Sequence, residues 1–295
     1  MKIAGHTMGT PEYSLPDAIK LFNRIGLEGV EIVVQEGYGC ALPERPTHDV
    51  LLETRNLVGD MGLEVSALTP YFSRFNDLDK KVRQQEVDGL RRVIGSAAFL
   101  GAPFIRIYAG NYPLNDTDPT GEKEAHLVKS MQILGDDARA SGVSLVLENH
   151  FNTMTVSAAS SIRISRLIDR KNVGILYDQA NLVFTNCEGY EQAITLQSEK
   201  ILYTHVKDLK FKSEDHSFVS SDVSHQKKDE RNVITRIVGE GSLDWPAILK
   251  FLHSTGYDGW LSLEYERRWH PQDIPDASIG MQKSAQYIRD CLMEL

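Results

Sequence analysis

The chain alternates between short runs of branched apolar residues and longer amphipathic segments. The short runs are typical of strands buried on both faces, because a parallel sheet that helices cover has no solvent-exposed face. The amphipathic segments end at helix-stop residues such as Gly101 and Gly256. This pattern predicts strands at residues 2–7, 29–34, 63–69, 104–109, 143–149, 172–178, 201–207 and 260–265. It predicts helices between and after them at residues 14–25, 47–62, 79–100, 120–141, 157–170, 188–199, 244–255 and 277–293.

Strict alternation of strands and helices is compatible with an open doubly wound sheet or with a closed barrel. The open sheet usually has a Gly-rich turn after its first strand, and Gly5-His-Thr-Met-Gly9 matches GxGxxG poorly. We therefore predict an α/β fold, a (β/α)8 TIM barrel formed by residues 1–295 as a single domain. A polar insertion at about 212–232 follows the seventh strand, and we interpret it as a floppy loop, a lid or a subunit contact.

Composition excludes several classes of protein. The 295 residues are 41% hydrophobic and 25% charged, and the formal net charge of −9 argues against a nucleic-acid surface. No apolar run approaches the roughly 18 residues of a membrane span, and no basic-then-apolar leader precedes the first strand. Cysteines 40, 187 and 291 are far apart, which is typical of a reducing compartment. We expect a cytoplasmic protein without nucleic-acid or membrane partners.

Polar residues end four of the predicted strands. They are Glu148, Asp178, His205 and Glu264. A single carboxylate of this kind is most simply a helix cap or a surface charge, but the carboxyl ends of barrel strands meet at one rim. We therefore expect the four side chains to bind one divalent metal ion. Oxygen-rich sites with one nitrogen suit Mn²⁺, which we favour, and also Mg²⁺ or Co²⁺, with Zn²⁺ as a further alternative.

Period-two alternation predicts which strand residues face the inside of the barrel. If Leu145 and Leu147 face the helices, Glu148 points inward. By the same reasoning Arg106 points inward from the fourth strand, and Glu31 can do so from the second. We expect Arg106 and Glu31 to form an ion pair inside the barrel, because a single buried charge is unstable there.

Several short motifs lie at or near the predicted strand ends and in the turns between elements. They are Leu147-Glu-Asn-His150, Tyr177-Asp-Gln-Ala-Asn181, His205-Val-Lys-Asp208, Gly239-Glu-Gly-Ser-Leu-Asp-Trp245, Gly256-Tyr-Asp-Gly259 and Leu263-Glu264. In their order along the chain they resemble the motifs of the xylose isomerase-like sugar phosphate isomerase/epimerase superfamily. The resemblance spans essentially the whole chain. It implies a (β/α)8 barrel, often a homodimer or homotetramer, with one metal ion held by the residues at 148, 178, 205 and 264. The superfamily includes ketose 3-epimerases, hydroxypyruvate isomerase, inosose dehydratase, dehydroshikimate dehydratase and endonuclease IV.

The resemblance implies an isomerase or epimerase of a small polyhydroxy carbonyl compound. Such an enzyme moves a proton at the carbon next to a carbonyl through a metal-stabilised enediolate, with Glu148 and Glu264 as the acid–base pair. The alternative with the same metal site is a dehydratase of a keto-inositol or related cyclic ketone. Two departures from the family pattern argue against strict ketohexose epimerisation. Ketose 3-epimerases have His where this chain has Asn181, and Arg where it has Phe211.

Five residues near the strand ends are candidates for substrate binding: His6, Tyr108, His150, Asn181 and Lys207. Lys207 resembles the Lys of a His-x-Lys-Asp motif in the inositol and dehydratase branches, where it would polarise a carbonyl or protonate a leaving hydroxyl. It is equally well explained as a partner of a rim carboxylate. His6 has a second interpretation as a satisfied core imidazole. Two further hypotheses are an endonuclease IV-like enzyme, which requires more His ligands, and a catalytically silent sugar-binding barrel.

Overall fold

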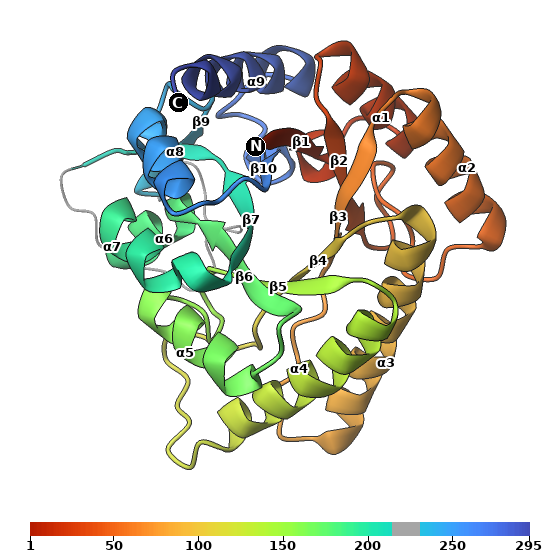
Figure 1. The fold of residues 1–295 in the computed structure, drawn as a ribbon, viewed down its shortest axis with the longest axis vertical. Coiled ribbons are helices and arrows are strands. Elements are labelled where there is room, and N and C mark those ends of the chain that lie inside the picture. Colours follow the sequence, from red (N-terminus) through yellow and green to blue (C-terminus); the bar gives the residue numbers. More distant parts are fainter. Residues whose placement is uncertain (214–230) are drawn as a thin grey trace.

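Eight parallel strands close into a barrel around the centre of the molecule (Figure 1). The structure is a computed structural model that describes residues 1–213 and 231–295. The barrel strands follow the order β1-β10-β7-β6-β5-β4-β3-β2, so β1 pairs with both β2 and β10. The bounds are β1 Lys2–His6, β2 Gly29–Val34, β3 Glu64–Pro70, β4 Phe104–Ile107, β5 Ser144–Glu148, β6 Val173–Asp178, β7 Ile201–Val206 and β10 Trp260–Leu263. The predicted (β/α)8 barrel is confirmed.

Helices surround the barrel, as Figure 1 shows. They are α1 Leu15–Arg24, α2 His48–Asp60, α3 Lys80–Leu100, α4 Glu122–Ala140, α5 Ala158–Ile168, α6 Gln179–Asn186, α7 Tyr190–Gln197, α8 Trp245–Ser254 and α9 Ala277–Met293. Side-chain caps fix where several of them begin. Ser14, Thr47 and Ser157 each accept a hydrogen bond from a backbone N–H three residues later, which satisfies a donor that the helix itself leaves unpaired.

An additional helix and an additional pair of strands were not expected from the sequence. The first is α6, which begins directly after β6 because the Asp178 side chain accepts a hydrogen bond from the backbone N–H of Asn181. The second is an antiparallel pair of short strands, β8 Asp208–Phe211 and β9 Val233–Arg236. These strands are far apart in sequence, so no local turn signal marks them. The predicted insertion at 212–232 lies outside the described residues except at its two ends.

The barrel has separate inner and outer cores. The outer core fills the space between strands and helices and includes Leu145 and Leu147. The inner core lies inside the barrel and consists of Ala4, Ala67, Val146, Leu176, Tyr203 and Trp260, with Phe104 and Leu202 packed against it. Neighbouring β5 residues therefore point to opposite sides, as the period-two pattern predicts. This alternation places Glu148 and Asp178, which end β5 and β6, over the inner core.

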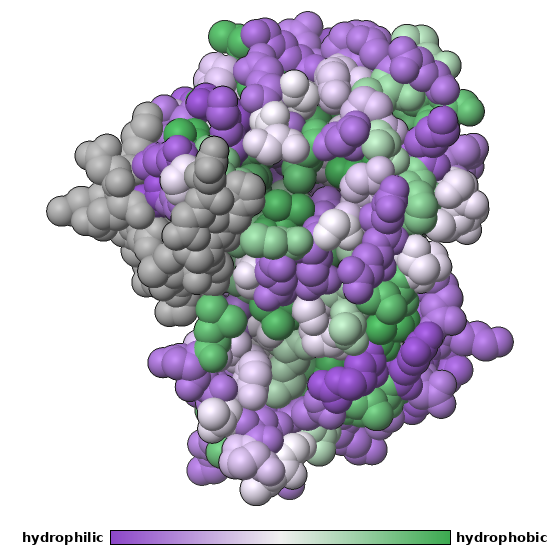
Figure 2. Space-filling model, turned by 90° about the vertical axis from the view of Figure 1, so that its left-hand side faces the viewer, coloured by the Kyte–Doolittle hydropathy of each residue, from purple (hydrophilic) through white to green (hydrophobic). Residues whose placement is uncertain are grey.

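The outer surface is mixed in character. The face in Figure 2 has hydrophilic and hydrophobic residues interspersed over it. Within residues 1–213 and 231–295, none of the helices combines the length and the apolar composition that crossing a membrane requires.

The close approach of β6 and β7 predicts the effect of one substitution. A Cβ added at Gly174 would lie 2.6 Å from Leu202 Cδ1 and 2.6 Å from the backbone oxygen of Lys200. We expect Gly174→Ala to lower the free energy of unfolding by about 1–3 kcal/mol, because the backbone oxygen cannot move without disturbing the barrel.

Gly95→Ala is the matched control. A Cβ at Gly95 in α3 meets no atom within 4 Å. This substitution should raise the free energy of unfolding by about 0.5–1 kcal/mol, because alanine favours the helix. Urea unfolding measures both values, and the steric argument is wrong if the two substitutions change stability in the same direction.

Candidate metal centre

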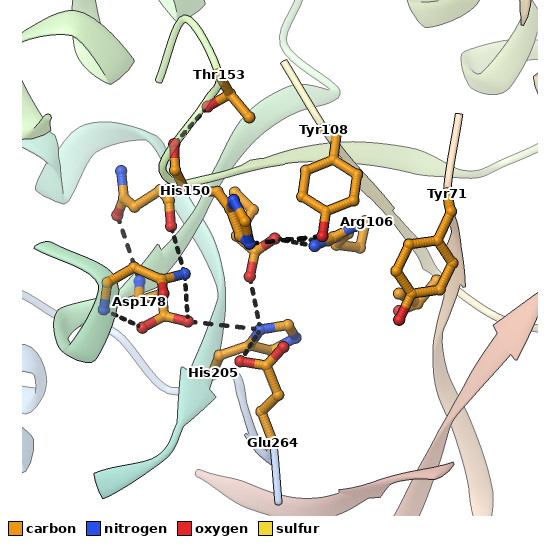
Figure 3. A network of polar contacts seen from close by, with 12 residues as sticks. Tyr71, Arg106, Tyr108, His150, Thr153, Asp178, His205 and Glu264 are labelled. Atoms are coloured by element: carbon orange, nitrogen blue, oxygen red, sulfur yellow. Dashed lines mark hydrogen bonds and ion pairs between the residues drawn. The ribbon is translucent and has the colours of Figure 1, made fainter. Parts of the chain in front are cut away.

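Four polar side chains meet at the carboxyl ends of four neighbouring barrel strands (Figure 3). They are Glu148 at the end of β5, Asp178 at the end of β6, His205 near the end of β7 and Glu264 directly after β10. His205 Nδ1 lies 3.2 Å from Glu148 Oε1, 3.4 Å from Glu264 Oε2 and 3.9 Å from Asp178 Oδ2. One potential ligand atom from each residue lies within 4.8 Å of the others. The four side chains are therefore within reach of a single ion.

The chemistry of this cluster fits a divalent cation. Three carboxylates and one imidazole offer oxygen and nitrogen ligands, as sites for Mn²⁺, Mg²⁺, Co²⁺ and Zn²⁺ do. All four residues are buried, so the carboxylates cannot be stabilised by bulk water. Burial raises the pKa of Asp178 to about 7, against the opposing effect of Lys207. Positive neighbours lower the pKa of the Glu148 and Glu264 carboxyl groups, so Asp178 is the carboxylate of the cluster whose ionised form is least stabilised, and a cation would stabilise it.

Arg106 balances one side of the cluster, and its partner is not the one that we expected. Its Nε donates a hydrogen bond to Glu148 Oε2 at 2.6 Å, and its Nη2 contacts the same oxygen (Figure 3). The expected pairing with Glu31 is wrong, although both side chains are buried inside the barrel. Arg106 is in register with Val146 on the adjacent strand, and Glu148 lies two residues further along the same face. The long guanidinium side chain reaches that neighbour.

This pair keeps Glu148 ionised. Burial alone would raise the pKa of its carboxyl group, but Arg106, together with His150 and His205, outweighs burial and holds the pKa at about 2. The guanidinium also lies over the ring of Tyr108, 3.4 Å from the ring centroid. Glu148 therefore has the charge of a metal ligand and one oxygen already committed to Arg106.

Lys207 supplies positive charge on the other side of the cluster. Its Nζ donates to Glu264 Oε2 at 2.7 Å and lies 3.0 Å from Asp178 Oδ2. Glu266 Oε1 is 3.5 Å away. Burial lowers the pKa of Lys207, but these carboxylates have the larger combined effect and raise it well above its ordinary value. The side chain is therefore an ammonium group, and it lies at the wall of a cavity.

This cavity opens beside the cluster and has a volume of about 250 Å³. Its size suits a small molecule. The polar residues that line it include Arg106, Asn181, Lys207, Glu264 and Glu266, and the apolar or aromatic residues include Met8, Tyr71, Tyr108, His150, Phe151, Phe184 and Trp269. Four of the five predicted substrate-binding residues, those at 108, 150, 181 and 207, thus lie at its wall.

His150 and Tyr108 form a T-shaped pair at this wall, with ring centroids 4.7 Å apart and an interplanar angle of 86°. His150 Nδ1 lies 2.7 Å from the carbonyl oxygen of Phe151. A carbonyl oxygen only accepts hydrogen bonds, so the ring hydrogen is on Nδ1 and Nε2 is an acceptor. Burial lowers the pKa of His150 to about 4, so the ring is neutral at pH 7. Its Nε2 lies 3.5 Å from the Tyr108 hydroxyl.

Asn181 and His6 have different positions relative to the cavity. Asn181 lines the cavity, and its Nδ2 donates to Asp178 Oδ2 at 3.0 Å, which orients that carboxylate. His6 lies deeper in the barrel, where its Nε2 is 3.5 Å from Glu31 Oε1. The described residues at the cavity wall do not include His6, and its position fits the interpretation as a satisfied core imidazole.

Part of the cavity wall could not be predicted from the sequence. The wall residues that we did not identify include Met8, Phe151, Phe184, Arg231, Val233, Thr235, Trp269 and His270. Val233 and Thr235 belong to β9, and only the pairing of β9 with β8 brings them to the rim. A signal did exist for Phe151 and Trp269, because both follow soon after a predicted ligand in the chain.

Asp208 explains why a glycine stands at position 241, after the β8–β9 strand pair. Its carboxylate accepts hydrogen bonds from the backbone N–H groups of Leu209, Gly239, Gly241 and Leu243, at 2.9 to 3.2 Å. A Cβ at Gly241 would lie 2.0 Å from Asp208 Oδ1, so glycine is required for this approach. The residue whose carboxylate holds this turn therefore directly follows Lys207 in the sequence.

Comparisons with known proteins agree with this architecture. A family model described as a xylose isomerase-like TIM barrel matches residues 19–291. An inosose dehydratase from Geobacillus thermodenitrificans (strain NG80-2) is 28% identical over 185 residues, which are 60% of this chain and 58% of the relative. An inosose dehydratase from Lacticaseibacillus casei is 26% identical over 151 residues, 50% of this chain and 49% of the relative. The chain thus spans about half the length of the curated relatives that it matches.

Solved structures share the fold at low sequence identity. A crystal structure of the IolI protein with a bound zinc atom has a TM-score of 0.78 and 18% identity, and the match covers 100% of this chain and 99% of IolI. An L-ribulose 3-epimerase has a TM-score of 0.78 and 18% identity, covering 99% of this chain and 95% of the epimerase. A probable 3-DHS dehydratase from Bacillus anthracis has a TM-score of 0.77 and 17% identity, covering 98% and 99%.

Removal and return of a divalent cation should change the stability of the protein. We expect Mn²⁺ or Zn²⁺ to raise the melting temperature of chelator-treated protein, because the ion binds the folded cluster and not the unfolded chain. At an ion concentration 100 times the dissociation constant, the expected gain is about 2.7 kcal/mol. Differential scanning calorimetry with and without EDTA measures it. An unchanged melting temperature with every ion would show that the cluster does not bind a cation.

Arg106→Met tests the buried pair at the cluster. It leaves Glu148 without its positive partner, so we expect a loss of about 3–5 kcal/mol in the cation-free protein. Arg170→Met is the control, since Arg170 pairs with Asp136 at the surface and should cost at most about 1 kcal/mol. Urea unfolding measures the free energy of unfolding of both variants. The role of Arg106 is contradicted if Arg106→Met loses no more stability than Arg170→Met.

Proposed function

This chain belongs to the xylose isomerase-like TIM barrel family, and we propose that it is a metal-dependent dehydratase of a cyclic polyhydroxy ketone of the inosose class. The observation that carries this proposal is the contact between Lys207 Nζ and Glu264 Oε2 at 2.7 Å in the cavity wall. The similarity to inosose dehydratases supports it. The sequence alone favours isomerisation or epimerisation as the reaction, with dehydration as the alternative. The contact between these two residues favours the reverse order.

Dehydration needs a base and an acid, and Glu264 and Lys207 supply them from the same wall. The Glu264 carboxylate takes the proton from the carbon next to the ketone. The Lys207 ammonium gives a proton to the hydroxyl on the following carbon. The C–H and C–O bonds break, a C=C bond forms and water leaves. Because the two side chains are in contact, the proton on Glu264 can pass to the Lys207 amine and return both groups to their starting state.

The residues at 148, 178, 205 and 264 would hold the divalent cation. When bound, the cation supplies Lewis acidity that polarises the ketone oxygen. Arg106 keeps Glu148 ionised for this purpose, and Asn181 keeps Asp178 oriented. Donor chemistry places Mn²⁺ first among the candidate ions, and the zinc atom in the structural neighbour IolI makes Zn²⁺ the main alternative.

The cavity supports a ring-shaped substrate. Tyr71, Tyr108 and Trp269 contribute flat apolar faces, and C–H groups of a six-membered ring can pack against them. Polar groups on the remaining wall can bind hydroxyl groups of the ring. The neutral His150 has an acceptor nitrogen close to the Tyr108 hydroxyl, which makes this pair suitable for one such hydroxyl. A homodimer or homotetramer stays a prediction from the family resemblance.

Isomerisation or epimerisation with Glu148 and Glu264 as the acid–base pair is the second candidate function. Structural neighbours such as L-ribulose 3-epimerase favour it. However, the described residues that line the cavity include Glu264 and do not include Glu148, which is 0% exposed and holds Arg106. Epimerisation needs a second acid–base group at the opposite face of the substrate. Glu148 could act there only if its ion pair with Arg106 were broken and the carboxylate became exposed. For this reason we place epimerisation second.

An NMR screen in D₂O with added Mn²⁺ or Zn²⁺ tests the proposal. Inososes, ketoses and 3-keto glycosides are incubated with the protein, and ¹H spectra distinguish proton exchange, epimerisation and loss of water. We expect dehydration of an inosose. Epimerisation of a ketose without dehydration would support the second candidate, and no exchange with any compound would indicate a catalytically silent barrel.

Lys207→Met should separate the two halves of the reaction. We expect the dehydration rate to fall by about 10²–10⁴-fold, because the leaving hydroxyl loses its proton donor. Exchange of the proton next to the ketone should continue, because Glu264 is intact. Lys210→Met is the control, since Lys210 is an exposed residue of β8 in the same segment. Dehydration at a near wild-type rate in Lys207→Met would remove Lys207 from the mechanism.

A further inference from the structure

A second polar layer lies inside the barrel directly behind the candidate metal ligands. Its centre is Glu31, which is 0% exposed. The Thr69 hydroxyl donates a hydrogen bond to Glu31 Oε1, and the Tyr203 hydroxyl donates to Oε2 at 3.2 Å. His205 Nε2 lies 3.2 Å from each of the two oxygens. The carboxylate therefore faces the side of His205 that is opposite to the candidate metal centre.

The hydrogen on the His6 ring can be placed from its contacts. The backbone N–H of Met8 donates to His6 Nδ1 at 3.1 Å, so Nδ1 is an acceptor and the ring hydrogen is on Nε2. His6 Nε2 lies 3.5 Å from Glu31 Oε1, and the two residues are in register on β1 and β2. Glu31 thus faces one imidazole N–H from His6 and the two hydroxyl donors, with His205 Nε2 as the remaining neighbour.

We propose that Glu31 is a positioning residue that keeps the ring hydrogen of His205 on Nε2, so that Nδ1 faces the metal centre without a hydrogen. Glu31 accepts the hydrogen of His205 Nε2 and holds the ring in place. The lone pair of Nδ1 is then directed at the space between Glu148, Asp178 and Glu264. With the opposite tautomer a hydrogen on Nδ1 would point into that space and exclude a cation. This inference rests on the metal centre of the proposed function and adds the residue that prepares it.

The same layer could be interpreted as a second cation site, because ligand atoms of His6, Glu31 and His205 lie within 4.8 Å of one another. The hydrogen bonds argue against this interpretation. Thr69 and Tyr203 already donate hydrogen bonds to the Glu31 oxygens, and the His6 ring hydrogen faces Oε1 at a nitrogen–oxygen distance of 3.5 Å. The negative charge of Glu31 is therefore satisfied by fixed donors, and the layer acts as a support for His205.

Cation binding by a variant of Glu31 tests the proposal. Glu31→Gln keeps the size of the side chain, removes its charge and replaces one acceptor oxygen by a donor. We expect its affinity for Mn²⁺ and Zn²⁺ to fall by about 10–100-fold, as is typical when the partner of a ligating His is lost. Isothermal titration calorimetry, or competition with a fluorescent chelator, measures the affinity and the number of ions for each chain. The wild-type protein should bind one ion.

Ser66→Ala is the matched control. Ser66 is buried in the same part of the barrel and its Oγ lies 2.8 Å from the Tyr203 hydroxyl, one step removed from Glu31. Its loss damages the layer without touching His205, so cation affinity should stay within about twofold while stability falls. Equal losses of affinity in the two variants would reduce Glu31 to a structural role. The proposal would also be overturned if Glu31→Gln bound the cation with wild-type affinity. The same holds if the wild-type chain bound two ions and the variant only one.

NMR on the wild-type protein tests the hydrogen position even if Glu31→Gln does not fold. Long-range ¹H–¹⁵N spectra of metal-free and Zn²⁺-loaded protein should show a hydrogen on His205 Nε2 in both states. A bare Nε2 in either state would overturn the proposal. If the wild-type protein binds no cation, the metal centre of the proposed function fails. The metal-free spectrum then still decides whether Glu31 holds the Nε2 hydrogen.

Discussion

Concentration of negative charge inside the barrel is the constraint on which the rest of the structure depends. Glu31, Glu148, Asp178 and Glu264 are all buried within a few ångströms of His205. Arg106 and Lys207 are the buried cationic side chains that contact them. With His205 neutral, as a metal ligand must be, four ionised carboxylates against two cations leave two negative charges, which is the charge that a divalent ion balances. Without the ion, burial lowers the pKa of His205, but the surrounding carboxylates have the larger combined effect and raise it well above its ordinary value. The cluster is thus most stable when it holds the ion that we propose for its chemistry.

His205 connects the two halves of this charge system. One ring nitrogen faces the three carboxylates at the mouth of the barrel, and the other faces Glu31 behind them. Strand register makes the arrangement possible, since Asp178 is in register with His205 on β6 and β7, and His6 with Glu31 on β1 and β2. The site is therefore built on rigid strands, which hold ligand atoms more accurately than loops can.

The surroundings of the cluster decide between related reactions that share one metal site. Arg106 forms a buried ion pair with Glu148, whereas Lys207 contacts Glu264 at the cavity wall. The two carboxylates of the expected acid–base pair therefore have different environments. An unequal pair of this kind suits a reaction in which a base and a separate acid act on neighbouring atoms. The antiparallel pair of β8 and β9 and the turn held by Asp208 place Lys207 beside the cavity. Function within this fold is thus set by residues next to the metal ligands.

The sequence by itself determined the barrel, the order of its elements and the four candidate ligands. Hydrophobic periodicity is a local property, and the carboxyl ends of parallel strands must share one rim, so Glu148, Asp178, His205 and Glu264 could be placed together without coordinates. Only the tertiary structure decided the partners of the buried charges. Arg106 pairs with Glu148 and not with Glu31, because strand adjacency and side-chain reach set that choice. The β8–β9 hairpin and its wall residues also required coordinates, since pairing between distant segments leaves no local periodic signal.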